Sequence, residues 1–197
     1  MRLARWFAVL AFLFVVSSCD TPAEPVAESE SFNAPGIDPN FGLFGHANLA
    51  VGAGRFAIGA LSVRYLFSGL QIGSHAFGSF FHSVDLGDGE KAEFVSKVSC
   101  LAFDPENQRA WFGGVILKNN STANSGFTAA IHQPGKDIWF RILDTGNSAE
   151  PDRSTFVGFE GSAGFITSAE YCAGMPWPDL NARTNPVTEG QIVIKAH

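Results

Sequence analysis

Short apolar segments separated by turn residues constrain the fold of this chain more than any other feature. From residue 41 onward, apolar stretches are repeatedly interrupted by glycine, proline, asparagine and aspartate, which favour tight turns. The chain holds 19 phenylalanines and 21 glycines, and no segment after the N-terminus shows a clear helical period. Residues 41–197 are therefore predicted to form one all-β domain, an antiparallel β-sandwich or small β-barrel of about seven to ten strands.

Strands are predicted wherever an apolar run lies between two turn signals. Glu93–Phe103 and Ala110–Lys118 flank the turn sequence Asp104-Pro105-Glu106-Asn107, which predicts a hairpin. Gly113-Gly114 inside the second run indicates a bulge or a close approach of two backbones. Phe156–Tyr171 is ambiguous between strand and irregular structure. The other expected elements are a hairpin that joins Phe127–His132 to Asp137–Leu143 and strands at Arg55–Phe67, Ala76–Leu86 and Gln191–Ala196.

The N-terminal segment has the order of parts found in an export signal. Met1–Arg5 carries two arginines, Trp6–Val16 is an unbroken apolar run, and small residues lead into Cys19. A helix over that run would be about 16 Å long, too short for a hydrocarbon core of about 30 Å. Residues 1–18 resemble a bacterial lipoprotein signal peptide with its lipobox. This resemblance implies that Cys19 carries a diacylglyceryl group and an N-acyl chain; an ordinary secretory signal is the alternative.

Lipidation of Cys19 implies a bacterial cell-envelope protein that is anchored in a membrane and faces the periplasm or the exterior. Asp20, directly after the cysteine, favours the inner membrane by the same resemblance. Residues 19–40 are rich in acidic residues, proline and serine without an apolar period, so they are expected to form a solvated tether. The membrane is the expected partner, and the sequence identifies no protein or small-molecule partner.

The remaining cysteines form a pair. With Cys19 assigned to the lipid, Cys100 and Cys172 are an even number of thiols in an oxidising compartment. We expect a disulfide between them, and two buried free thiols are the alternative. Neither cysteine lies in a Cys-x-x-Cys or histidine-rich spacing that would indicate a metal site.

The charge of the chain argues against a nucleic-acid partner. The formal net charge is −6, and removal of Arg2 and Arg5 with the signal peptide leaves −8. Nucleic-acid binding needs a basic patch that neutralises phosphates, and the sequence offers none. An acidic surface also gains nothing from anionic lipid headgroups, so the fatty chains would supply the membrane affinity.

The sequence carries no catalytic signature. Gly-x-Ser-x-Gly, His-Glu-x-x-His and the P-loop pattern are missing, and we assign no catalytic residues. The histidines are scattered over the chain, and His75 and His82 would lie on opposite faces of one strand. We therefore expect a non-catalytic binding or interaction module. The alternative is an envelope hydrolase whose site is assembled only by the fold.

Two acidic loops are candidate calcium sites. Asp85–Glu90 and Asp144–Asp152 each bring oxygen-bearing side chains together around a glycine, and Ca²⁺ takes about six to eight oxygen ligands. Neither loop follows the EF-hand spacing, so turn formation on a solvated acidic face is the alternative. Calcium is the one cofactor considered, for a calcium-stabilised structural domain. The candidate ligands in the second loop are Asp144, Asn147, Glu150 and Asp152.

Tryptophans are the remaining candidates for a binding site. Trp111, Trp139 and Trp177, together with the many phenylalanines, could line a ligand pocket of the kind found in β-barrels. The alternative is that these large aromatic side chains form the hydrophobic core.

The first predicted hairpin also carries a family resemblance. The resemblance is carried by residues of the hairpin and of an acidic loop further along the chain, and by the second cysteine. They are Val98-Ser99-Cys100-Leu101, Asn107, Ala110, Gly113-Gly114-Val115, Asp144, Gly146, Asp152 and Cys172. Over most of Gly45–His197 the chain is similar to a group of uncharacterised secreted bacterial proteins. The resemblance implies a β-rich fold with a hairpin, a bulge, a disulfide and a loop, and it implies no activity. The chain departs from the group at Ser68–Phe81, which is more apolar.

Overall fold

The computed structural model describes residues 47–146, 148–179 and 181–197. The predicted signal peptide, Cys19 and the predicted tether lie outside these residues. The strands are β1 (Ala47–Ile58), β2 (Leu61–Ile72), β3 (His75–Gly87), β4 (Glu90–Asp104), β5 (Arg109–Asn119), β6 (Asp137–Leu143), β7 (Arg153–Ser154), β8 (Gly158–Phe159) and β9 (Asn185–Lys195). The helices are α1 (Ser168–Gly174) and the 3₁₀ turns η1 (Ala130–His132), η2 (Ser162–Gly164) and η3 (Asn181–Arg183).

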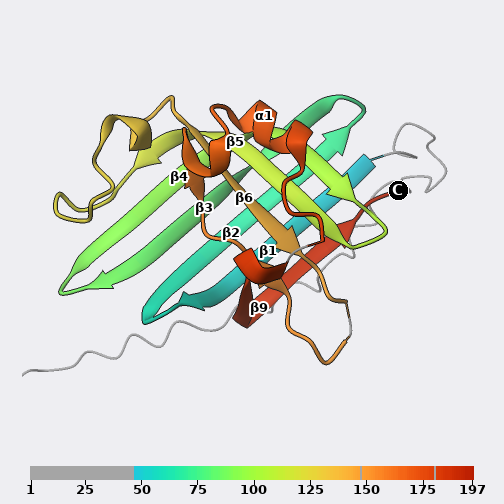
Figure 1. Cartoon of the computed structure of the whole chain (residues 1–197), viewed down its shortest axis with the longest axis horizontal. Coiled ribbons are helices and arrows are strands. Elements are labelled where there is room, and N and C mark those ends of the chain that lie inside the picture. The colour runs from blue at the N-terminus through green and yellow to red at the C-terminus, as the bar shows by residue number, and fades with distance from the viewer. Residues whose placement is uncertain (1–46, 147, 180) are drawn as a thin grey trace, which may run out of the picture. The chain divides into compact units, whose positions relative to one another are not determined.

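The strands form one antiparallel sheet that closes nearly into a ring (Figure 1). Hairpins join β1 through β5 in chain order, β5 pairs with β6, and β6 leads through β7 and β9 back to β1. The prediction of an all-β domain is confirmed, and this strand order corresponds to the barrel alternative. Strands predicted at Ala76–Leu86, Glu93–Phe103 and Ala110–Lys118 lie within β3, β4 and β5, and Asp137–Leu143 is β6.

The single strand predicted at Arg55–Phe67 is wrong, because the chain turns inside it. β1 ends at Ile58, β2 begins at Leu61, and these two residues pair across the turn. Gly59 has a φ of 58° there, a left-handed conformation that glycine adopts without steric cost. One glycine inside a long apolar run was too weak a signal to predict this turn.

The second predicted hairpin is also wrong. Phe127–His132 forms a loop that ends in η1, and β6 pairs with β5 instead. Nδ2 of Asn119 holds this loop, since it donates to the carbonyls of Phe127 at 2.8 Å and His132 at 2.9 Å. Pairing with β6 satisfies the edge of β5, which a local hairpin would have left open.

The helix α1 was missed because it spans only seven residues. It lies in and just after the ambiguous segment Phe156–Tyr171, which also contains β8 and η2. A capping box starts the helix: Glu170 N donates to Thr167 Oγ1 at 3.1 Å, and Thr167 N donates to the Glu170 carboxylate at 3.3 Å. The sequence signal for α1 is therefore the spacing of Thr167 and Glu170, not an apolar period.

Aromatic rings fill the interior of the barrel. The rings of Phe67, Phe112 and Phe140 contact one another, with centroids 4.8 to 5.4 Å apart, and all three are buried. Such contacts are favourable beyond the burial of apolar area. The phenylalanines of adjoining strands pack into the same core: Phe56, Phe80 and Phe94.

Gly113-Gly114 confirms the predicted close approach of backbones. A Cβ on Gly113 would lie 2.9 Å from the Ser168 carbonyl oxygen, and one on Gly114 would lie 2.4 Å from the Lys97 carbonyl oxygen. The register between β4 and β5 also shifts at Val98/Cys100, as a bulge requires.

Two aspartate carboxylates continue the short β7–β9 pairing where the ring of strands is incomplete. Because β7 has only two residues, it pairs with β9 only at Asn185 and Pro186, and none of the other described strands pairs with the rest of that edge. Ile192 N donates to Asp152 Oδ2 at 2.7 Å, and Ile194 N donates to Asp144 Oδ2 at 2.8 Å. Both isoleucine side chains lie in the core, so the two aspartates hold a core strand in place.

Asp152→Asn is expected to lower the free energy of unfolding by about 2 kcal/mol, because a charged acceptor is lost from a partly buried hydrogen bond. Urea unfolding measures this change. Asp88→Asn is the matched control, since Asp88 is exposed in the β3–β4 turn and Asn tolerates its φ of 50°. Equal stability of the two variants would contradict the closing role of Asp152.

His82 is an ionisable group inside the aromatic core. Its side chain is 1% exposed, its ring lies 4.7 Å from the Phe140 ring between centroids, and neither ring nitrogen has a hydrogen-bond partner among the described residues. Burial lowers the pKa of His82 to about 3. The unfolded chain binds this proton near pH 6.5, so stability falls as the pH drops from about 6.5 toward 3.

His82→Leu is expected to remove this acid sensitivity. Between pH 7 and pH 5 the variant should lose about 2 kcal/mol less unfolding free energy than the unmodified protein, because its unfolded state has one fewer site to protonate. Urea unfolding at several pH values measures the slope. His75→Leu, which removes an exposed histidine of the same strand, should keep the original slope; a parallel slope for His82→Leu would refute the assignment.

Candidate functional site

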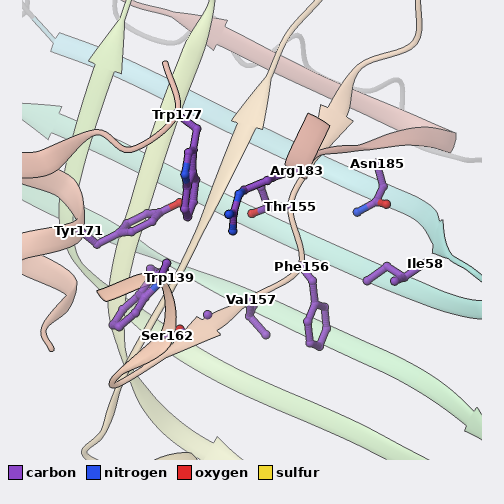
Figure 2. Close-up of a pocket in the computed structure, with 12 residues that line it drawn as sticks. Ile58, Trp139, Thr155, Phe156, Val157, Ser162, Tyr171, Trp177, Arg183 and Asn185 are labelled. Carbon is purple, nitrogen blue, oxygen red and sulfur yellow. The ribbon is translucent and has the colours of Figure 1, made fainter. Parts of the chain in front are cut away.

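A cavity of about 400 Å³ lies beside β6, and Ile58 at the end of β1 and Val157 of the barrel core are among its lining residues (Figure 2). It is bordered by β6, by the segment from β7 to η2, by α1 and by the chain that enters β9. We call it the aromatic pocket, after the residues that dominate its lining: Trp139, Phe156, Tyr171, Trp177, Arg183 and Asn185.

The floor of the aromatic pocket is a stacked pair of rings. Trp139 and Tyr171 are almost fully buried, with ring centroids 5.5 Å apart and planes inclined by 20°. Trp139 points outward from β6 because strand residues alternate, and its neighbours Ile138 and Phe140 face the core. A Cβ on Gly158 would lie 2.3 Å from the Trp139 indole nitrogen, so only glycine lets β8 pass this close.

Trp177 stands at one side of the pocket on a strained segment. It has a φ of 58°, unusual for a bulky residue, and it lies between Pro176 and Pro178. Two buried side chains hold the segment: Trp111 Nε1 donates to the Pro176 carbonyl at 3.0 Å, and the Arg141 guanidinium donates to the Trp177 carbonyl. Strain of this kind persists only where the surroundings impose it, and it is concentrated at binding and active sites.

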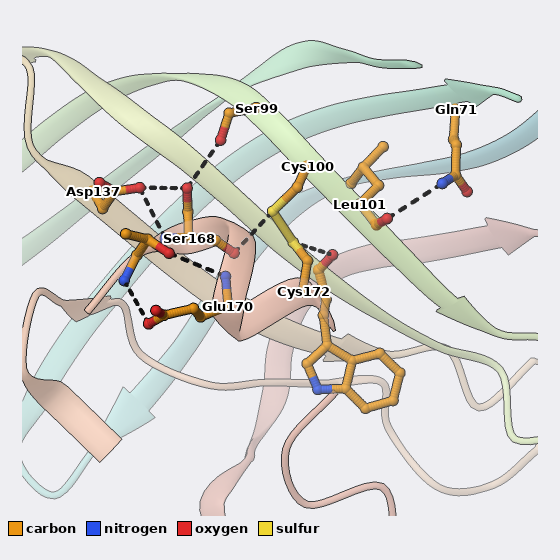
Figure 3. The surroundings of a disulfide bond; sticks show 10 residues. Gln71, Ser99, Cys100, Leu101, Asp137, Ser168, Glu170 and Cys172 are labelled. Carbon is orange, nitrogen blue, oxygen red and sulfur yellow. Dashed lines mark hydrogen bonds between the residues drawn. A yellow bond between two sulfur atoms is a disulfide. The ribbon is translucent and has the colours of Figure 1, made fainter. Parts of the chain in front are cut away.

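The helix that carries Tyr171 is fixed to the barrel at both ends (Figure 3). Cys100 of β4 and Cys172 of α1 form a disulfide, which confirms the predicted pair. At the start of the helix, Ser168 N donates to Asp137 Oδ1 at 2.8 Å, and Ser168 Oγ also hydrogen-bonds the Asp137 carboxylate. The floor of the pocket is therefore attached to β4 and β6 by covalent and polar contacts.

The pocket is positively charged although the protein is acidic. Arg183 is its single charged lining residue among those described, and its guanidinium carbon lies 4.5 Å from the centroid of the Trp177 ring. Arg141, almost fully buried, lies behind the strained segment. Burial raises the pKa of Tyr171 above its usual range, so its hydroxyl stays protonated at neutral pH.

Two of the three predicted tryptophans line the aromatic pocket. Trp139 and Trp177 do so, whereas Trp111 is fully buried and borders a neighbouring cavity of about 560 Å³ together with Phe103 and Asp104. Tyr171 and Arg183 were not predicted, because they are single residues brought in from distant segments. The proline on each side of Trp177 is the sequence signal that could have marked this site.

The histidines do not form a catalytic arrangement within the described part of the chain. His82 lies in the barrel core, and buried His132 packs on Phe159, with no hydrogen bond to Nδ1. His75 and His197 are exposed, and His46 lies outside the described residues. The envelope hydrolase stays an alternative prediction.

The predicted calcium loop is engaged in hydrogen bonds. Besides the bonds to β9, Asp144 accepts from Gly146 N at 2.7 Å and Asp152 accepts from Thr145 N at 3.0 Å. Glu150 is exposed, and Asn147 lies outside the described residues. Among the residues that were placed, no group of three or more histidine, cysteine, aspartate or glutamate side chains could hold a metal ion. Calcium binding by this loop stays a prediction.

Comparisons with known proteins do not extend these observations. A scan against protein-family models and searches of curated proteins and of solved structures found no match to this chain. None of the helices in the described ranges is long and apolar enough to span a membrane. The resemblances to lipoproteins and to secreted β-rich proteins stay predictions.

Proposed function

We propose that the protein is a non-catalytic binding module that binds one small molecule in the aromatic pocket. We also propose that a lipid attached to Cys19 anchors it at the cell envelope. The observation that carries the proposal is the construction of the pocket. A strained Trp177 is held beside a stacked Trp139–Tyr171 floor. Ligand sites are typically apolar cavities of about 300–1,000 Å³ with a few placed polar groups, and this cavity falls within that range.

The polar groups of the pocket favour binding over hydrolysis. The Ser162 hydroxyl is occupied, since it accepts from Phe159 N at 2.7 Å and donates to the Phe159 carbonyl at 2.5 Å. Thr155 Oγ1 accepts from Arg141 N at 2.9 Å. Among the described residues that line the pocket none is a histidine, the usual base that activates a hydroxyl nucleophile.

The envelope location has two supports. The lipobox-like sequence before Cys19 is the first. The Cys100–Cys172 disulfide is a weaker one, because disulfides persist in oxidising compartments. A lipid anchor followed by a solvated tether would hold the binding domain away from the bilayer.

A neutral flat probe, 2-naphthamide, tests the proposed pocket. We expect calorimetry to show binding with a Kd near or below about 1 mM, and Trp177→Ala to weaken it about tenfold through loss of aromatic contact. Phe77→Ala is the control, since Phe77 is an exposed aromatic residue of β3 and should leave the Kd unchanged. Equal affinity for both variants would reject the pocket as the ligand site.

A further inference from the structure

The charge of the aromatic pocket is opposite in sign to the net charge of the whole protein. The chain has 19 acidic and 13 basic residues, yet the described lining contains no aspartate or glutamate and one arginine. The lining therefore has a local charge opposite in sign to the net charge of the whole protein. A site that presents an isolated cation in an acidic protein selects for an anion through electrostatic complementarity.

Arg183 is available to such an anion. It is exposed at the end of η3, and no carboxylate of the described residues lies within ion-pair distance of its guanidinium. Its guanidinium carbon lies over the Trp177 ring, 4.5 Å from the centroid (Figure 2), and a guanidinium that stacks on a ring by its face keeps its edge for hydrogen bonds. That edge carries the pair of N–H donors that binds a carboxylate through two parallel hydrogen bonds.

The position of Arg183 is set in advance of binding. Its guanidinium rests on Trp177, and the backbone of Trp177 is held by Trp111 and Arg141. Apolar side chains lie across the cavity from it, including Phe156 and Val157. The pocket therefore presents one cationic point beside an apolar surface, which matches a ligand with one anionic group on a flat apolar body.

We propose that the ligand of the aromatic pocket is an organic anion, a carboxylate carried on an apolar ring, and that Arg183 is the residue that selects it. This inference rests on the proposed binding function and names its ligand class. The carboxylate would pair with the Arg183 guanidinium, while the ring would occupy the space bounded by Trp139, Phe156 and Val157.

The test compares 2-naphthoate with 2-naphthamide, which have the same ring and differ in charge. At low salt, calorimetry should show naphthoate binding about tenfold more tightly than the amide, with the difference shrinking as salt is raised. Arg183→Gln should abolish that difference, because naphthoate binding should weaken about tenfold, toward the affinity of the amide. Arg64→Gln, which removes an exposed arginine from the outer face of β2, should retain the difference.

The outcomes separate the two proposals. If both probes bind the unmodified protein with equal Kd, the pocket is a ligand site but the selection of anions is refuted. If naphthoate keeps its advantage in Arg183→Gln, Arg183 is not the selecting residue and the inference fails. If neither probe binds, both the ligand class and the proposed function are overturned.

Discussion

The N–H groups of Ile192 and Ile194 lie on the edge of β9 that pairs with no other strand of the described chain beyond β7, and they donate to the carboxylates of Asp152 and Asp144. An unpaired buried N–H is costly, so these bonds decide whether β9 can stay in the ring. β9 in turn pairs with β1 along most of its length. The hairpins from β1 to β5 could form without this contact, but the enclosed core could not.

Phenylalanine rings fill the interior of the barrel, and the candidate site lies against its wall at β6. β6 serves both sides: Phe140 contributes to the core, while Trp139 and Arg141 face outward beneath α1 and the segment around Trp177. Binding at such a site uses the barrel as a rigid support.

The sequence predicted correctly those features that depend on residues close together in the chain or on composition alone. Turn residues and alternation located β3, β4, β5 and β6, and counting thiols paired Cys100 with Cys172. The partners of β6 could not be predicted, because pairing with β5 depends on which edge remains open after the other hairpins form. Asp144 binds β9, and Tyr171 and Arg183 line the aromatic pocket. These roles depend on contacts between segments far apart in the chain, which cannot be inferred from a single sequence.

Arg141 of β6 is bonded to two segments that line the aromatic pocket, those of Thr155 and Trp177. Its backbone N and O pair with Thr155 Oγ1 and N, each at 2.9 Å, while its guanidinium reaches the Trp177 carbonyl. One residue of β6 thereby fixes two loops that would otherwise have to be ordered by the ligand. A ligand that enters loses its own freedom but costs the protein little conformational entropy, so even a small molecule with few contacts can be retained.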